Sequence, residues 1–349
     1  MTSEGCSMKA LLLDAPGRLR PGVWPDEESE RGRLHLSVQV VSVCGSDLHY
    51  YKEGKIGAAI AESPFVLGHE FSAVVNDERG EEFGIPPGTL VAVDPAEPCD
   101  RCEWCMHGYT NLCPNVRFAG TAPVPGALRE FYNARPDELY PLPEGFDAVD
   151  GALLEPLGVA VHALDLARVP LGATVAVVGT GAIGLLIAQV AQVAGASEVH
   201  VVEPLAYRRE IALRLGCDAA HADPGALIEA TAGRGSDVVI EATDTPEGPD
   251  VACQVVRIGG RVVLVGIPDG DRFSLTASIA RRKGLTVKFS RRMGHVYPRA
   301  IGLVAAGRVN LGVLVTHRFP LERGAEAFEI QADRRDGAVK AVIKVGSEV

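Results

Sequence analysis

Three residues of types that bind zinc lie within the first 70 positions of the chain. Cys44 ends an apolar run, and His69 follows 25 residues later with Glu70 beside it. One thiolate, one imidazole and one carboxylate supply three protein ligands, the number that a catalytic zinc ion takes when its fourth position stays open to water or substrate. The spacing is not a local motif, so separate structural roles for these residues remain an alternative. A further acid, Glu155, lies in an otherwise apolar segment, and we expect it to have a partner because an unpaired buried carboxylate is costly.

Four other cysteines lie within one short segment: Cys99, Cys102, Cys105 and Cys113. Two residues separate each of the first three, and seven residues separate the third from the fourth. Four thiolates at this spacing match a closed tetrahedral zinc site. The prolines and glycines around them indicate a loop that a metal would have to order. Disulfides are a second interpretation, disfavoured in a reducing compartment, and an iron–sulfur cluster is a third. The remaining cysteines are expected to be free thiols: Cys6, Cys217 and Cys253.

A glycine-rich motif, Gly179-x-Gly181-x-x-Gly184, follows a β-branched run and precedes a helical pattern. In this context the motif is typical of dinucleotide binding. Gly179 permits a tight turn, Gly181 lets the backbone approach a pyrophosphate, and Gly184 allows the helix to pack closely on the strand. The free N–H groups at the helix N-terminus would face the phosphates.

A dinucleotide-binding motif of this type is followed, about 20 residues further on, by an acidic residue. Glu203 meets this expectation, because it follows Gly184 by 19 residues and ends a second apolar run. Its carboxylate would accept hydrogen bonds from the adenosine ribose and repel a 2′-phosphate, which favours NAD over NADP. Arg208 and Arg209 are nearby, and arginine in this region can accommodate a 2′-phosphate. The alternative is that the glycines serve packing alone and that Glu203 lies on the surface.

Composition excludes several classes of protein. The 349 residues are 47% hydrophobic and 23% charged, as in ordinary globular proteins, and the net charge of −11 disfavours nucleic acid as a partner. The N-terminal apolar run is too short for a secretory signal, so we expect a cytoplasmic protein. Residues 169–197 carry no charge, yet they divide into a strand, a glycine turn and a helix, which argues against a membrane span.

The length predicts roughly two domains, and the pattern changes near residue 159. Before that point, short apolar runs separated by Gly and Pro indicate a β-rich sandwich or barrel, with strands at Leu34–Val43, Phe71–Val75 and Thr89–Val93. Beyond it, strands alternate with helices, which predicts a doubly wound parallel sheet. The expected strands are Thr174–Val178, Glu198–Val202, Asp237–Glu241, Gly260–Val265 and Leu285–Phe289, and the expected helices are Ile183–Ala194 and Tyr207–Leu215. The tail holds a helix-like segment from about Pro298 and a last strand at Ala341–Val345.

Together these motifs resemble the zinc-dependent medium-chain alcohol dehydrogenase family. The resemblance rests on Cys44-Gly-Ser-Asp-Leu-His49-Tyr-Tyr, Gly68-His-Glu70, the four-cysteine segment, Leu154-Glu-Pro-Leu and the glycine motif. The polyol (sorbitol/xylitol) branch is the most similar, through His49-Tyr50-Tyr51, Arg117-Phe118-x-x-Thr121 and Val315-Thr-His-Arg-Phe-Pro-Leu321. The match covers nearly the whole chain after Met8.

This resemblance implies an α/β chain with two domains. A GroES-like catalytic domain would comprise residues 1–157 and 298–349, with a structural-zinc lobe at about 95–115, and a Rossmann domain would comprise residues 158–297. It also implies a homo-oligomer, either a tetramer or a dimer.

The resemblance also assigns site residues. The catalytic zinc would be held by Cys44, His69 and Glu70, with Glu155 bound directly or through a water, and the structural zinc by the four clustered cysteines. Contacts to NAD would come from Gly179, Gly181, Ile183, Gly184, Glu203 and Arg208. A proton relay would draw on Glu155, Ser46 and His49. Substrate contacts would come from Tyr50, Phe118, Thr121 and Arg292, although Met293 stands where the family has a tyrosine.

The implied activity is oxidation of a polyol secondary alcohol to a ketose, in which zinc acidifies the substrate hydroxyl and NAD takes the hydride. Because of Met293, a sugar acid such as idonate, an aminocyclitol or another secondary alcohol remains an alternative substrate. A non-catalytic protein that binds zinc and nucleotide is the alternative from a different class.

Overall fold

The computed structural model describes residues 7–26 and 32–346, and Cys6 and the acidic residues Glu27 to Glu30 lie outside this part of the chain. The contacts between residues divide the chain into two units. The first runs to Glu155 and resumes at Val315, and the second comprises Pro156–Leu314. None of the helices in the described residues is both long enough and apolar enough to span a membrane.

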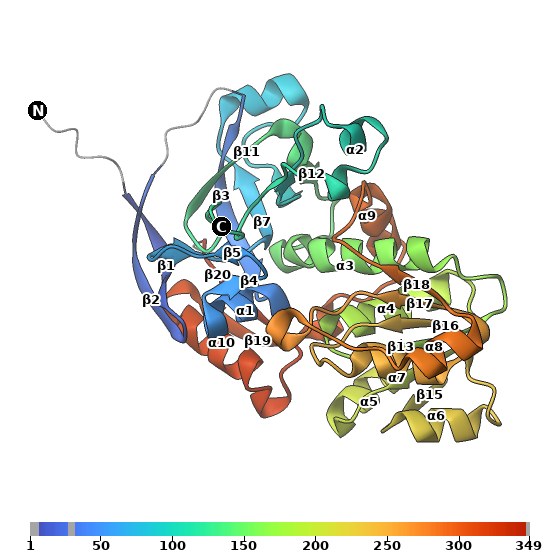
Figure 1. Cartoon of the computed structure of the whole chain (residues 1–349). Helices are drawn as coiled ribbons and strands as arrows, with labels where there is room; N and C mark the ends of the chain where they lie inside the picture. Colours follow the sequence, from blue (N-terminus) through green and yellow to red (C-terminus); the bar gives the residue numbers. More distant parts are fainter. Residues whose placement is uncertain (1–6, 27–31, 347–349) are drawn as a thin grey trace, which may run out of the picture. The chain divides into compact units, whose positions relative to one another are not determined.

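The first unit is built on a mostly antiparallel seven-stranded sheet (Figure 1). Along its main path the order is β12 (Leu139–Pro141), β8 (Leu90–Val93), β7 (Glu70–Val75), β3 (Leu34–Ser42), β20 (Lys340–Lys344) and β19 (Val315–Pro320), and β11 (Phe131–Ala134) also pairs with β3. A three-stranded sheet contains β2 (Arg18–Pro25), β1 (Ser7–Ala15) and β6 (Phe65–Val66). Alternating side chains of β3 and β7 are fully buried in one apolar core. The β-rich first domain expected from the sequence is therefore present.

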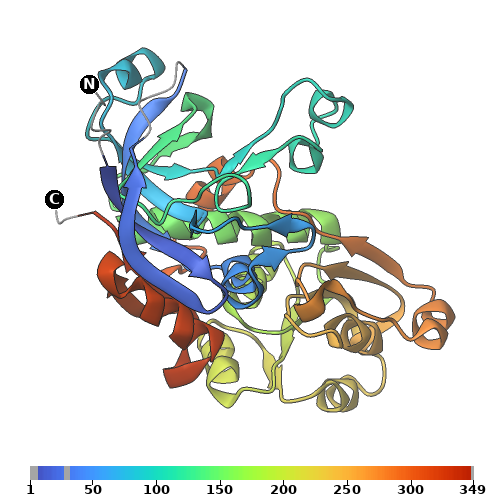
Figure 2. The ribbon, with the colours of Figure 1, turned by 60° about the vertical axis from the view of Figure 1, so that its left-hand side comes forward.

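Shorter elements complete this unit. Its helices are α1 (Gly45–Glu53), α2 (Glu103–Met106) and α10 (Gly324–Ala332), and its two-stranded sheets are β4 (Lys55–Ile56) with β5 (Ala59–Ile60) and β9 (Ala96–Glu97) with β10 (Arg117–Phe118). Helix α3 (Ala148–Ala167) begins here and continues into the second unit. Residues 99–113 form a loop that extends away from the strands of this unit, as its teal ribbon in Figure 2 shows.

Pairing of three strands brings residues from both ends of the chain together. Strand β3 pairs antiparallel with β7, so that Ser42 lies opposite Glu70. On its other side β3 pairs with β20, where Val342 lies opposite Ser42. The chain leaves β3 and enters helix α1 at Cys44, which is the N-cap residue. Cys44, Glu70 and the first residue of β20, Lys340, therefore converge at one end of the sheet.

The second unit is a parallel six-stranded sheet with helices on its faces (Figure 1). Its strand order is β15 (Ala219–His221), β14 (Glu198–Val202), β13 (Thr174–Val178), β16 (Ser236–Glu241), β17 (Val256–Leu264) and β18 (Thr286–Phe289). This is the doubly wound order, in which a ligand binds beyond the carboxyl end of the first strand. The helices are α4 (Ala182–Val193), α5 (Ala206–Arg214), α6 (Pro224–Ala230), α7 (Gly248–Val255), α8 (Ala277–Lys283) and α9 (Tyr297–Ala305).

The uncharged stretch of residues 169–197 contains strand β13 and helix α4, as expected. The tail differs from the expected domain boundary at residue 298. Arg299 forms an ion pair with Asp165 at 2.5 Å, and Asn310 exchanges two hydrogen bonds with Gln189 (2.7 and 3.3 Å). These contacts keep α9 and the residues up to Leu314 in the second unit.

Close packing at Gly184 gives a testable expectation. A Cβ atom added there would lie 1.9 Å from the carbonyl oxygen of Gly179, so Gly184→Ala should destabilise the protein by roughly 1–3 kcal/mol. Gly302→Ala is the matched control, because a Cβ in that helix meets no atom within 4 Å and should stabilise by about 0.4–1 kcal/mol. Scanning calorimetry measures both changes. Equal melting temperatures for the two variants would contradict this packing.

Candidate metal and dinucleotide sites

Cys44, His69 and Glu70 form one cluster in the first unit. Their ligand atoms all lie within 4.8 Å of one another. The pairing of β3 with β7 brings Cys44 and Glu70 together, because Cys44 follows β3 and Glu70 begins β7. His69 is 5% exposed and Glu70 is fully buried, whereas Cys44 is partly exposed, so one side of the cluster remains accessible.

Asp47 orients the imidazole of His69. The Nδ1 atom of His69 lies 3.3 Å from Oδ1 of Asp47, whose carboxylate also accepts hydrogen bonds from the backbone N–H groups of Gly68 (3.2 Å) and Cys44 (3.1 Å). Burial lowers the pKa of His69, but the charges of Asp47 and Cys44 outweigh it and hold this pKa well above its usual value. With Nδ1 directed at a carboxylate, Nε2 is left for a ligand, as in many metal-binding histidines.

Only one of the two carboxylate oxygens of Glu70 has hydrogen-bonding partners in the described structure. Oε2 accepts a hydrogen bond from Oγ of Ser42 and pairs with Nζ of Lys340 at 2.5 Å. Oε1 is buried and makes no hydrogen bond in the described structure. A buried carboxylate oxygen without a partner is costly, and a cation held between Glu70, Cys44 and His69 would supply that partner. The residues present therefore fit a metal ion.

Lys340 connects this cluster to Glu155. Its side chain is 3% exposed, and Nζ also donates to the carbonyl oxygen of Val43 at 3.0 Å. Burial lowers the pKa of Lys340, but the negative groups of Glu70, Cys44 and Glu155 raise it above its ordinary value. Glu155 is 4% exposed, so its carboxyl is buried in the same electrostatic environment. It is not one of the three residues whose ligand atoms lie within 4.8 Å.

Two other residues of the expected site lie beside His69. Ser46 Oγ is 3.4 Å from Nε2 of His69, and the ring of Phe118 lies 5.3 Å from the imidazole, centroid to centroid. His49 is buried, at 8% exposure, and is therefore not a surface histidine. The structure thus brings Ser46 and Phe118 to the cluster.

Tyr50 differs from expectation. It was expected to line a substrate pocket, but it is 1% exposed and belongs to the apolar core of the first unit. Its hydroxyl accepts a hydrogen bond from the backbone N–H of Ala122 at 3.2 Å and is hydrogen-bonded to the side chain of Thr121. Through these hydrogen bonds Tyr50 ties α1 to the loop near residue 122, and the substrate contact of Thr121 stays a prediction.

In the second unit, Arg292 and Met293 lie where the backbone adopts an uncommon conformation. Arg292 has a φ of +52°, a conformation that is uncommon for residues other than glycine. Met293 is 1% exposed and packs against Gly158, where an added Cβ would lie 2.1 Å from the methionine sulfur. Met293, which stands where the family has a tyrosine, therefore packs in the interior of this unit.

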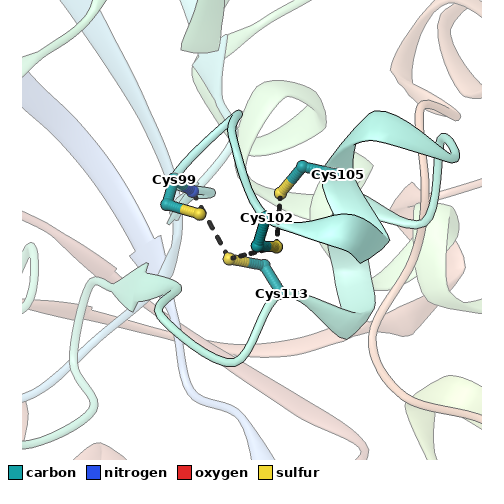
Figure 3. Close-up of side chains that lie close together, drawn as sticks. All are labelled: Cys99, Cys102, Cys105 and Cys113. Atoms are coloured by element: carbon teal, nitrogen blue, oxygen red, sulfur yellow. Dashed lines mark hydrogen bonds between the residues drawn. The ribbon is translucent and has the colours of Figure 1, made fainter.

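The four clustered cysteines converge on one point (Figure 3). The sulfur of Cys102 lies 3.4 Å from that of Cys105 and 3.9 Å from that of Cys113, and the N–H of Cys99 donates to Cys113 at 3.4 Å. All four are free thiols, since a disulfide requires about 2.05 Å. Four sulfurs each about 2.3 Å from one tetrahedral ion lie roughly 3.8 Å apart. The spacing suits a single ion better than an iron–sulfur cluster, where several irons separate the sulfurs.

The glycine motif connects β13 to α4 with the conformations that its sequence indicates. Gly179 has a φ of +86°, which favours glycine, and Gly184 lies against the carbonyl of Gly179. A Cβ on Gly181 would meet no atom nearer than Nη1 of Arg208, at 3.8 Å. The backbone of Gly181 therefore borders open space at the N-terminus of α4, where a ligand phosphate can approach.

Glu203 is a buried residue, at 3% exposure, and not a surface acid. Its Oε2 accepts from the backbone N–H of Thr180 at 2.9 Å, and its Oε1 accepts from that of Leu205 at 3.0 Å. Arg208 lies 3.9 Å from the same carboxylate, whereas Arg209 donates to the carbonyls of Glu203 and Pro204 at 2.7 Å. The two arginines are thus committed to local contacts around this acid.

Sequence reasoning missed three residues of the metal cluster: Asp47, Ser42 and Lys340. Asp47 carries a usable signal, because it lies in the same short motif as Cys44. Lys340 carries none, since 270 residues separate it from Glu70 and only the pairing of β20 with β3 brings it near.

Comparisons with known proteins agree with this geometry. The family model of the alcohol dehydrogenase GroES-like domain matches residues 30–144, and that of zinc-binding dehydrogenase matches residues 182–306. Sorbitol dehydrogenase from Bacillus subtilis (strain 168) is 31% identical over 344 residues, covering 97% of each chain. That of Homo sapiens is 35% identical over 327 residues, covering 92% of this chain and 91% of its own. The structure of L-idonate 5-dehydrogenase from Escherichia coli matches with a TM-score of 0.88 at 26% identity, covering 97% and 99%.

The chain therefore belongs to the zinc-dependent medium-chain alcohol dehydrogenase family. Within that family it is a member of the polyol branch, with the sorbitol dehydrogenases. Its first unit is a GroES-like domain, its second is a Rossmann domain, and its activity is that of a polyol-type oxidoreductase.

The ion pair of Lys340 with Glu70 gives a second testable expectation. Lys340→Met should destabilise the metal-free protein by roughly 3–5 kcal/mol, because it leaves the Glu70 carboxylate buried without its cation. Lys344→Met is the matched control in the same strand. Its side chain is exposed, and the change should stay within about 0.5 kcal/mol. Thermal unfolding measures both.

A double variant separates charge from packing. If the loss comes from the unpaired carboxylate, Lys340→Met combined with Glu70→Gln should recover part of the stability. A Lys340→Met protein as stable as the wild type would show that the ion pair does not hold this end of the sheet.

Proposed function

We propose that this protein is a zinc- and NAD-dependent dehydrogenase that transfers hydride from a secondary alcohol of a polyol to NAD and produces a ketose. The observation that carries this proposal is the close approach of Cys44, His69 and Glu70, in which Glu70 keeps one buried oxygen without a hydrogen bond. Sorbitol dehydrogenases are relatives along almost the whole chain, which supports the substrate class.

Zinc bound to these three residues would act as a Lewis acid that makes a substrate hydroxyl acidic, while the nicotinamide would accept the hydride. Asp47 keeps the imidazole of His69 in one tautomer, and Lys340 keeps the Glu70 carboxylate in place. Ser46 lies beside His69 and would take the proton from the substrate hydroxyl and pass it on, with His49 and Glu155 as further members of the relay. The ring of Phe118 lies against His69 at a tilt of 52°, and would contact the substrate.

NAD is the proposed cofactor because of the burial of Glu203. A buried carboxylate held by two backbone N–H groups is fixed in position, so it can accept hydrogen bonds from ribose hydroxyls and would repel a 2′-phosphate. Gly181, Ile183 and Arg208 would contact the rest of the dinucleotide. Arg208 already lies near Glu203 and stacks on Tyr207, which reduces its availability for a phosphate.

The four clustered cysteines would hold a second, structural zinc ion. Backbone N–H groups of Arg101 and Cys102 help lower the pKa of Cys99 to about 6, which favours the thiolate form that binds metal. Because their loop has no fully buried side chain on α2, the ion would supply much of its order.

We further propose a homo-oligomer, a dimer or a tetramer. In the described part of the chain, β18 pairs only with β17 and so leaves one edge of the parallel sheet open. Phe289 at the end of this strand is exposed and lies 5.8 Å from the ring of Phe273. An open edge beside exposed aromatic side chains suits a second copy. The cytoplasmic location stays a prediction.

A substrate panel tests the activity. The holoprotein with NAD should produce NADH from D-sorbitol or xylitol, and a strong chelator should abolish this turnover until zinc is restored. Absorbance at 340 nm measures the rate. Because Met293 replaces the family's tyrosine, L-idonate and an aminocyclitol belong in the panel, and faster turnover of either would assign the alternative substrate. Binding of zinc and NAD without turnover of any alcohol would contradict the enzymatic function.

Glu203 tests the cofactor. Glu203→Gln removes the negative charge, so kcat/KM for NAD should fall by about 10–100-fold while the preference for NAD over NADP shrinks. Glu210→Gln, an exposed acid on helix α5, is the control and should leave both values unchanged. A wild-type enzyme that uses NADP as well as NAD, or a variant with unaltered preference, would contradict the role of Glu203.

A further inference from the structure

Besides Glu203, a second buried acid lies at the carboxyl end of the parallel sheet. Glu241 ends strand β16 and is 1% exposed. A doubly wound sheet of this strand order has two halves, each of which holds one nucleotide of a dinucleotide. Strands β13, β14 and β15 form the half that carries the glycine motif, and β16, β17 and β18 form the other half. Glu241 therefore belongs to the half that would take the nicotinamide nucleotide.

The side chain of Glu241 joins two loops that follow neighbouring strands. Its Oε1 accepts hydrogen bonds from the backbone N–H of Thr243 at 2.7 Å and from the hydroxyl of the same residue at 2.5 Å. Its Oε2 accepts from the backbone N–H of Gly266, in the loop after β17, at 3.3 Å. Further along these two loops, the N–H of Asp269 donates to the carbonyl oxygen of Asp244 at 2.9 Å. One carboxylate thus fixes the start of both loops.

Glycines allow the backbone to approach this carboxylate closely. A Cβ atom added at Gly248, the first residue of α7, would lie 2.0 Å from the hydroxyl oxygen of Thr243 and 2.7 Å from Oε1 of Glu241. A Cβ added at Gly266 would lie 1.9 Å from the carbonyl oxygen of Thr243 and also 2.7 Å from Oε1. Both loops and the start of α7 are therefore packed directly against the side chain of Glu241.

Thr243 extends this arrangement to the glycine motif. A Cβ atom added at Gly179 would lie 2.6 Å from the methyl carbon Cγ2 of Thr243 and 2.9 Å from the carbonyl oxygen of Ala242. Strands β13 and β16 are neighbours, so this contact lies where the two halves of the sheet meet. The loop that Glu241 holds is thus placed at the border that a bound dinucleotide has to cross.

We propose that Glu241 is a positioning residue, which holds the loops after β16 and β17 in the conformation that receives the nicotinamide half of the cofactor. This inference rests on the dinucleotide binding proposed above. Glu241 acts through the loops, because its side chain is covered and both of its oxygens already accept hydrogen bonds. In the other half, Glu203 holds the N–H groups of Thr180 and Leu205 independently of Glu241. Loss of the Glu241 carboxylate should therefore weaken binding of the whole dinucleotide and spare its adenosine half.

Equilibrium titrations with NADH and with ADP, which lacks the nicotinamide riboside, separate the two halves. Glu241→Met removes both acceptor oxygens, so the Kd for NADH should rise by at least about tenfold while the Kd for ADP stays within about twofold. Glu241→Gln keeps one carbonyl oxygen for Thr243 and should recover part of the affinity for NADH. Glu247→Gln, an exposed acid in the loop after β16, is the matched control and should bind both ligands like the wild type.

Thr243→Val is a second variant, which keeps the inference testable if Glu241→Met does not fold. It retains a methyl group against Gly179 and removes the hydroxyl that donates to Glu241. The Kd for NADH should rise by roughly 3–10-fold, again with little change for ADP. NADPH is titrated in parallel, so that the result does not depend on which dinucleotide the protein prefers.

Two results would overturn the role of Glu241 and leave the proposed cofactor in place. One is an unchanged Kd for the dinucleotide in both Glu241→Met and Thr243→Val. The other is an equal loss of affinity for ADP and for the dinucleotide, because Glu241 would then support the unit as a whole. A wild type that binds neither NADH nor NADPH would contradict the proposed function itself, and the inference with it.

Discussion

The first unit is arranged around a buried carboxylate. Glu70 is fully buried at the start of a central strand, and burying a charge without partners costs several kcal/mol. One of its oxygens is satisfied by Ser42 and Lys340, and the other is left for a cation. The pairing of β3 with β7 and with β20 brings these partners to Glu70. It also explains why a lysine from the far end of the chain is buried beside the residues that carry the chemistry.

The second unit meets a comparable requirement mainly with backbone hydrogen bonds, with Arg208 3.9 Å away. Glu203 is also a buried carboxylate, but backbone N–H groups from the turns after β13 and β14 satisfy both of its oxygens. It therefore connects the glycine motif to the following loop before any ligand binds. The two acids therefore differ: Glu70 has one oxygen left for the metal ion that we propose, whereas both oxygens of Glu203 already accept hydrogen bonds.

Much of this architecture could be predicted from the sequence, for physical reasons that differ between the units. Parallel strands buried on both faces are continuous apolar runs, so Thr174–Val178 and Glu198–Val202 were located to the residue. The cysteines and the glycine motif depend on short-range spacing, which a sequence displays directly. What could not be predicted depends on strand pairing and on which face of an element is buried. Lys340 meets Glu70 only through β20, and Tyr50 lies on the inner face of α1 although its motif suggested a pocket.

The central claim is that this chain holds two zinc ions in two separate clusters, one catalytic and one structural. Metal analysis of the purified protein by inductively coupled plasma mass spectrometry tests it most directly, on the wild type and on Cys44→Ser and Cys105→Ser. We expect about two zinc ions per chain in the wild type and about one in each variant, with dehydrogenase activity lost in Cys44→Ser. A wild type with a single zinc, or a Cys44→Ser protein that retains both, would contradict the assignment of the Cys44–His69–Glu70 cluster.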